Sequence, residues 1–176
     1  MVDTNRRKRL AFHLRQLIVG ITTNDDFENA VTEEITVGWL PEQYHKSKIA
    51  KTDDSINLPI IEQCWTLYSD LENHKLEGKY KLSLEQEKVL SRCILFLQTD
   101  IEYKWPYFNI KAQYSLLDYL IILLTLGLYH PSRKKQMLSY IEWQKNGDFE
   151  VWPFFSQNEY EAQLKNQPFL NGINAA

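Results

Sequence analysis

This chain has few of the residues that mark disulfide-rich, disordered or strongly charged proteins. It contains two cysteines, six glycines and six prolines among 176 residues. Cys64 and Cys93 lie in apolar helical patterns, which predicts buried free thiols rather than a disulfide or a metal clip. So few glycines and prolines argue against a disordered chain. A net charge of −3 argues against general nucleic-acid binding, because that requires a concentrated positive surface.

The sequence also lacks an apolar run long enough to cross a bilayer. Its most apolar segment, residues 116–129, is shorter than the about 20 residues that a spanning helix needs, and it contains Asp118. We therefore expect a buried central helix, roughly residues 114–129. No apolar signal segment follows the basic residues 6–9, which favours a cytoplasmic protein.

The patterns that are present are helical. Apolar residues recur at helical spacing along most of the chain, and residues 23–26, 83–86 and 156–159 have the form of capping boxes. No stretch alternates with a period of two for long enough to predict a sheet. The sequence predicts an all-α fold of about seven helices around the central apolar helix. It predicts one compact domain over residues 1–170 and a flexible C-terminal tail over residues 171–176.

An aromatic motif occurs twice, as WPYF at residues 105–108 and as WPFF at residues 152–155. Each proline interrupts regular structure, and each large aromatic side chain can bury roughly 150–250 Å². The motifs are interpreted as structural anchors or as a paired binding surface. We expect Trp105 to behave as core and Trp152 to be the better contact residue. The candidate binding residues are Tyr103, Trp105, Glu150, Trp152 and Phe154.

No catalytic, phosphate-binding or metal-binding motif is present, and we predict no cofactor and no metal site. Two pairs of polar residues carry the alternative of a small enzyme or metal-binding protein. Asp70 and His74 are four residues apart, a spacing that places both side chains on one helix face. Asp100 and Glu102 lie among aromatic residues, which can raise the pKa of a carboxyl group. A solvent-exposed helix end explains each pair at least as well.

The N-terminal basic residues 6–9 have two interpretations. They could contact phosphates or acidic lipid, but the acidic residues elsewhere in the chain argue against this. A solvated helix face is the favoured interpretation.

Three segments together resemble small uncharacterised bacterial proteins. They are residues 65–74 (WTLYSDLENH), residues 92–106 (RCILFLQTDIEYKWP) and residues 148–154 (DFEVWPF). The resemblance covers about half of the chain. It implies a bacterial, cytoplasmic setting and assigns no activity.

These observations favour a non-catalytic protein-interaction module, for example a toxin-neutralising (immunity) protein or a regulatory adaptor. The expected partner is another protein, and an acidic chain favours a basic one because complementary charge accelerates association. Aromatic residues make up 13% of the chain and supply candidate anchors for such an interface. We expect no nucleic-acid partner and no membrane span.

Overall fold

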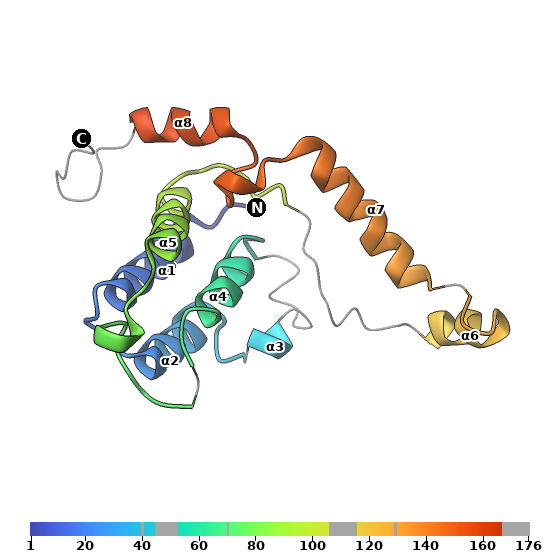
Figure 1. Cartoon of the computed structure of the whole chain (residues 1–176), viewed down its shortest axis with the longest axis horizontal. Coiled ribbons are helices and arrows are strands. Elements are labelled where there is room, and N and C mark those ends of the chain that lie inside the picture. The colour runs from blue at the N-terminus through green and yellow to red at the C-terminus, as the bar shows by residue number, and fades with distance from the viewer. Residues whose placement is uncertain (40, 45–52, 70, 106–115, 129, 167–176) are drawn as a thin grey trace. The chain divides into compact units, whose positions relative to one another are not determined.

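A computed structural model describes residues 1–39, 41–44, 53–69, 71–105, 116–128 and 130–166. These residues form helices and turns, and none of them lies in a β-strand (Figure 1). The predicted all-α class is confirmed. The chain divides into two compact units, residues 1–103 with 149–176, and residues 104–148.

The first unit begins with two helices that pack against each other, α1 (Thr4–Ile18) and α2 (Asn24–Glu34). The Asp3 side chain caps α1 by accepting a hydrogen bond from the Arg6 backbone N–H. Thr23 and Asp26 form the predicted capping box of α2. Between the two helices, Gly20 has a φ of 70°, a left-handed conformation that glycine adopts without steric cost.

Three further helices and a 3₁₀ turn follow in this unit. They are α3 (Pro41–Tyr44), α4 (Asn57–Trp65), the turn η2 (Gly78–Tyr80) and α5 (Leu84–Leu97). Ser83 and Gln86 form the predicted capping box of α5. After the second unit the chain returns as the 3₁₀ turn η3 (Phe149–Val151) and as α8 (Gln157–Asn166).

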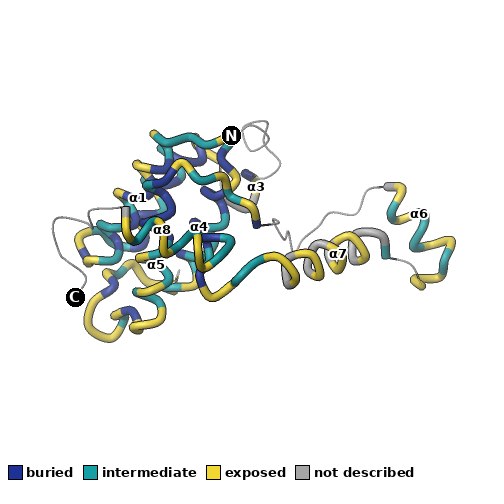
Figure 2. The backbone as a smooth tube through the Cα atoms, turned by 90° about the horizontal axis from the view of Figure 1, so that it is seen from above, coloured by how far each residue is buried: buried dark blue, intermediate teal, exposed yellow. Residues whose placement is uncertain are grey.

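The hydrophobic core of the first unit lies mainly between α1, α2, α4 and α5, with α1 and α5 side by side. Figure 2 marks the buried residues in dark blue, and they gather in this unit. Both cysteines are buried and unpaired, as predicted. The core includes Leu10, Leu14, Leu17, Phe27, Val31, Ile35, Ile56, Ile60, Ile61, Cys64, Leu90, Cys93, Ile94, Phe96, Leu97 and Phe154.

The second unit contains α6 (Leu116–Leu124) and α7 (Pro131–Asn146). Its described residues between 117 and 146 are exposed or half-buried, and Leu124 is 81% exposed. The expected central role of the apolar helix is therefore not confirmed, because α6 contributes no residue to the core described above. The count of about seven helices around it is likewise not confirmed. No helix within the described ranges is both long enough and apolar enough to cross a membrane.

The predicted single domain over residues 1–170 stays a prediction, because each compact unit is described by itself. The predicted tail, residues 171–176, lies outside the described residues.

Candidate interaction surface

A hydrogen bond joins the segment just before the first aromatic motif to the second aromatic motif. Nε1 of Trp152 donates to Oη of Tyr103 over 3.1 Å. Burial raises the pKa of the Tyr103 hydroxyl above its ordinary value, because the charged phenolate would lose its hydration there. The bond connects the segment after α5 to the segment after η3, which lie 49 residues apart in sequence.

Buried side chains hold the Trp152 segment in place. Val151 and Phe154 are almost fully buried, and the Phe154 ring contacts the Phe96 ring of α5 edge to face at 5.1 Å between centroids. Nε of Arg92, also on α5, donates to the Trp152 backbone carbonyl over 3.1 Å. The peptide bond between Trp152 and Pro153 is cis. Contacts at Trp152 and at Phe154 therefore fix this segment to α5.

The same segment presents other side chains to solvent. Phe149 is 62% exposed, and Glu150 beside it is exposed. Trp152 is half-buried, so one part of its ring is anchored while another part is accessible. On the connected segment, Glu102 is exposed next to Tyr103. We call these five residues, Glu102, Tyr103, Phe149, Glu150 and Trp152, the aromatic–acidic surface.

The structure distributes the five candidate binding residues between anchoring and accessible positions. Phe154 is completely buried and Trp105 is 6% exposed, which are the environments of structural anchors. Tyr103 and Trp152 are half-buried, and Glu150 is exposed. The environments of Trp105 and Trp152 therefore differ in the direction that the sequence indicated. Phe149 is an exposed aromatic residue that is not among the five candidates.

The alternative catalytic candidate His74 lies in a second polar cluster. Asn24 at the start of α2 holds its backbone, because the Asn24 N–H donates to the His74 carbonyl over 3.0 Å and Oδ1 of Asn24 accepts from the His74 N–H over 2.7 Å. The His74 ring stacks on Tyr80 with 3.8 Å between centroids. Tyr80 in turn donates a hydrogen bond to Glu72. Asp70 lies outside the described residues.

Asp100 and Glu102 lie near the start of α1. Oδ1 of Asp100 accepts a hydrogen bond from the Thr4 hydroxyl over 3.3 Å, and Glu102 forms an exposed ion pair with the N-terminal amine. His74 lies near the other end of α1, because it contacts Asn24 and the nearby Thr22 N–H donates to Gln16. Fifteen residues of helix measure about 22 Å. The structure therefore does not bring His74 together with Asp100 and Glu102.

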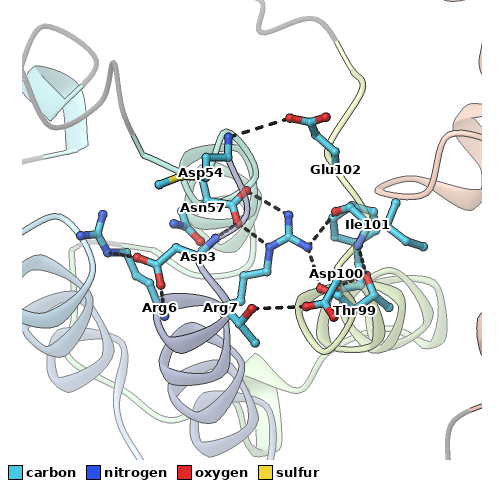
Figure 3. A network of polar contacts seen from close by, with 12 residues as sticks. Asp3, Arg6, Arg7, Asp54, Asn57, Thr99, Asp100, Ile101 and Glu102 are labelled. Atoms are coloured by element: carbon cyan, nitrogen blue, oxygen red, sulfur yellow. Dashed lines mark hydrogen bonds and ion pairs between the residues drawn. The ribbon is translucent and has the colours of Figure 1, made fainter.

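A buried ion pair lies beside Asp100. The Arg7 guanidinium is fully buried and makes two bonds to Asp54, from Nε over 2.5 Å and from Nη2 over 3.0 Å (Figure 3). Its Nη1 donates to the backbone carbonyls of Thr99 and Ile101, each over 2.9 Å. The guanidinium also lies over the Phe96 ring at 5.1 Å. Through these contacts Arg7 links α1 to the residues just before α4 and to the residues just after α5. The role of the cluster is structural.

The sequence interpretation of residues 6–9 as a solvated helix face is wrong for Arg7. Arg7 precedes Leu10, Ala11 and Leu14 by three, four and seven residues, and this spacing places it on the apolar face of α1. An arginine on such a face requires a buried anion, and Asp54 supplies it. Lys8 and Arg9 are exposed, as the interpretation expected.

Within the described residues, no group of three or more His, Cys, Asp or Glu side chains could hold a metal ion. Comparison of the chain with protein-family models, with curated proteins and with solved structures finds no match.

Proposed function

We propose that this chain is a non-catalytic protein-interaction module that binds a basic partner protein through the aromatic–acidic surface. The observation that carries the proposal is the bond between Trp152 Nε1 and Tyr103 Oη. It connects two segments that each carry an exposed acid, Glu102 and Glu150, next to aromatic rings. Aromatic anchors surrounded by charge are typical of binding hot spots.

The charge of the first unit supports a basic partner. Residues 1–103 and 149–176 contain 14 Lys and Arg against 20 Asp and Glu, a net charge of −6. An acidic surface attracts a basic protein over about one Debye length, roughly 10 Å at 0.1 M salt. Such complementarity increases the association rate and selects against acidic partners.

We also propose the biological setting that the sequence indicates, a bacterial cytoplasm. Two buried free thiols are consistent with a reducing compartment. Within that setting the module is a toxin-neutralising protein or a regulatory adaptor. A gene for a basic toxin beside the gene for this chain favours neutralisation, whereas a metabolic operon favours an enzyme.

The proposal is tested by capturing partners from extracts of the source cells with immobilised chain. We expect the double substitution Phe149→Ala with Glu150→Lys to reduce the captured basic partner at least about tenfold, because truncating one hot-spot residue costs 2 kcal/mol or more. The thermal midpoint should stay unchanged, since both side chains are exposed. Raising the salt concentration should slow association of the wild type.

A matched control is Phe12→Ala with Glu85→Lys, which removes one exposed aromatic ring and reverses one exposed acid elsewhere on the first unit. This variant should capture the partner as the wild type does. Equal loss in both variants, or full capture by Phe149→Ala with Glu150→Lys, would contradict the proposed surface.

A further inference from the structure

The two compact units carry opposite net charge. Residues 104–148 contain six Lys and Arg against three Asp and Glu, a net charge of +3, whereas the first unit carries −6. Charge asymmetry of this kind within one chain indicates that the basic part has a different, anionic partner. The aromatic–acidic surface of the first unit does not account for it.

The basic unit also exposes an unusual amount of apolar surface. Ordinary proteins rarely expose a large contiguous apolar patch unless it binds something. The exposed apolar side chains of this unit follow one another along α6, the turn after it and α7, where the exposed fractions range from 41% to 91%. They are Leu117, Tyr119, Leu120, Leu123, Leu124, Leu126, Leu128, Met137, Leu138 and Ile141.

The end of α6 concentrates the most exposed of these side chains at a turn. The Gly127 N–H donates to the Ile122 carbonyl over 2.8 Å, and the Leu126 N–H donates to the Leu123 carbonyl over 3.2 Å. Leu126 and Gly127 both have positive φ, so the backbone reverses sharply there. Leu126 and Leu128 are each 91% exposed on this turn.

Basic residues follow the apolar turn directly. The first turns of α7 contain Arg133, Lys134 and Lys135, and the side chains of Lys134 and Lys135 are exposed. A short apolar helix and turn, followed within a few residues by cationic side chains, has the chemistry of an interfacial element. In interfacial elements in general, the apolar part enters the boundary between lipid headgroups and acyl chains, and the cations remain at the headgroup level.

We infer that residues 116–128 and 130–135 bind the surface of an anionic phospholipid membrane. Leu123, Leu124 and the turn after them enter the interface, while Lys134 and Lys135 contact the lipid phosphates. Nine residues of α6 measure about 14 Å, less than half of a hydrocarbon core of about 30 Å. The attachment is therefore peripheral.

An anionic lipid surface explains both the positive charge and the exposed apolar side chains of this unit. A nucleic acid or a second copy of the unit would explain only one of these two properties. A nucleic acid would match the positive charge but not the leucine and isoleucine side chains of α6. A second copy of the same unit would cover the apolar side chains but would bring two charges of +3 together. The inference is independent of the aromatic–acidic surface.

The test is co-sedimentation of the full chain with large vesicles of phosphatidylcholine, alone or mixed with phosphatidylglycerol. We expect binding to the mixed vesicles that decreases at high salt, and weak binding to pure phosphatidylcholine. Lys134→Ala with Lys135→Ala should weaken the partition roughly 30-fold, because each lysine near an anionic surface contributes about a fivefold factor. Leu123→Ser with Leu124→Ser should weaken it more than about tenfold.

Two control variants in the first unit match these changes. Lys8→Ala with Arg9→Ala removes two exposed cations of α1, and Leu71→Ser with Leu84→Ser removes two exposed leucines. Both should bind vesicles within about twofold of the wild type, since they leave residues 116–135 unchanged. Circular dichroism of every variant checks that its helices are retained.

Three outcomes would overturn the inference. The first is no binding to the mixed vesicles. The second is equal loss in the control variants. The third is a stable dimer in light scattering that Leu123→Ser with Leu124→Ser dissociates while leaving vesicle binding unchanged, which would assign the apolar side chains to a second copy.

Discussion

α5 and α6 are both rich in leucine and isoleucine, and they lie in opposite environments. Six residues of α5 are buried, among them Leu90, Cys93 and Phe96. In α6, Leu123 and Leu124 are 73% and 81% exposed. Yet α6 is the more apolar of the two, since its nine residues include a single charged side chain, Asp118.

The two helices differ in how their charged residues are distributed and in the capping signals at their ends. α5 begins with the Ser83 capping box and carries acidic and basic residues on the face opposite to its core residues. α6 has a single charged residue, Asp118, among nine, and no capping box precedes it among the described residues, so fewer local signals mark which of its sides would pack against a core. High hydrophobicity predicts that a segment avoids water, whereas amphipathic spacing predicts which face of the helix is buried.

The largest expected effect concerns the contact that fixes the end of α5. Arg7→Ala should lower the free energy of unfolding by about 3–5 kcal/mol, because it leaves the Asp54 carboxylate buried without its counter-ion. Chemical denaturation of the purified variant measures this. Arg9→Ala, at an exposed position of the same helix, should change stability by less than about 0.5 kcal/mol.

Replacing both partners sharpens the same prediction. Arg7→Met with Asp54→Leu should recover most of the lost stability, since a well-packed apolar pair replaces a buried ion pair at little cost. A loss below about 1 kcal/mol in Arg7→Ala would show that the pair does not hold α5.

The second prediction compares one leucine in each helix. Leu90→Ala in α5 should cost about 2–5 kcal/mol, because the side chain is fully buried and its removal leaves a cavity. Leu124→Ala in α6 should cost no more than about 0.5 kcal/mol. Urea unfolding of both variants measures the contrast, and equal losses would break the comparison between the helices.

The third prediction concerns the two buried thiols, Cys64 on α4 and Cys93 on α5. Burial raises the pKa of Cys93 and of Cys64, so the folded chain keeps both protons at a pH at which the unfolded chain releases them. The free energy of unfolding should therefore fall as the pH rises above about 8.5, the ordinary thiol value.

Two substitutions isolate the Cys93 contribution. Cys93→Val should flatten part of the pH dependence, and Cys93→Ser should cost about 1–3 kcal/mol because it places a hydroxyl in the core. If a thiol reagent reacts rapidly with both cysteines of the native protein, the prediction that they are buried is wrong.

The smallest expected effect is at the start of α5. Ser83→Ala should cost about 1 kcal/mol, because the Ser83 hydroxyl accepts a hydrogen bond from the Gln86 N–H. Ser91→Ala, within the same helix, should be neutral or slightly stabilising, because alanine is the better helix former there. Thermal melts of the two variants distinguish a capping effect from a general effect of removing a hydroxyl.

Much of the helical structure follows from local signals in the sequence. The capping boxes at Thr23 and Ser83 form, and the helices that follow them bury the residues at helical spacing. These features are predictable because they depend on residues within one or two turns of each other. The burial of both cysteines is predictable for the same reason, since their apolar neighbours share their helices.

The core and the candidate surface were less predictable, because they depend on distant residues. Arg7 binds Asp54 and the carbonyls of Thr99 and Ile101, which are 47 to 94 residues away in sequence. The bond between Trp152 and Tyr103 is equally non-local. Hydrophobicity alone placed α6 at the centre of the fold, since a single sequence does not show which other surface an apolar helix meets.

The division of the chain has a consequence for its synthesis on the ribosome. The first unit is discontinuous, and Phe154, which packs on Phe96, is translated roughly fifty residues after the first segment of that unit ends at residue 103. At a translation rate of about 5–20 residues per second, Phe154 is added roughly 3–10 s after residue 103. Until the Phe154 ring packs on Phe96, the first segment of the unit lacks part of its core, so chaperone binding to that segment should persist until residues 149–155 have been made.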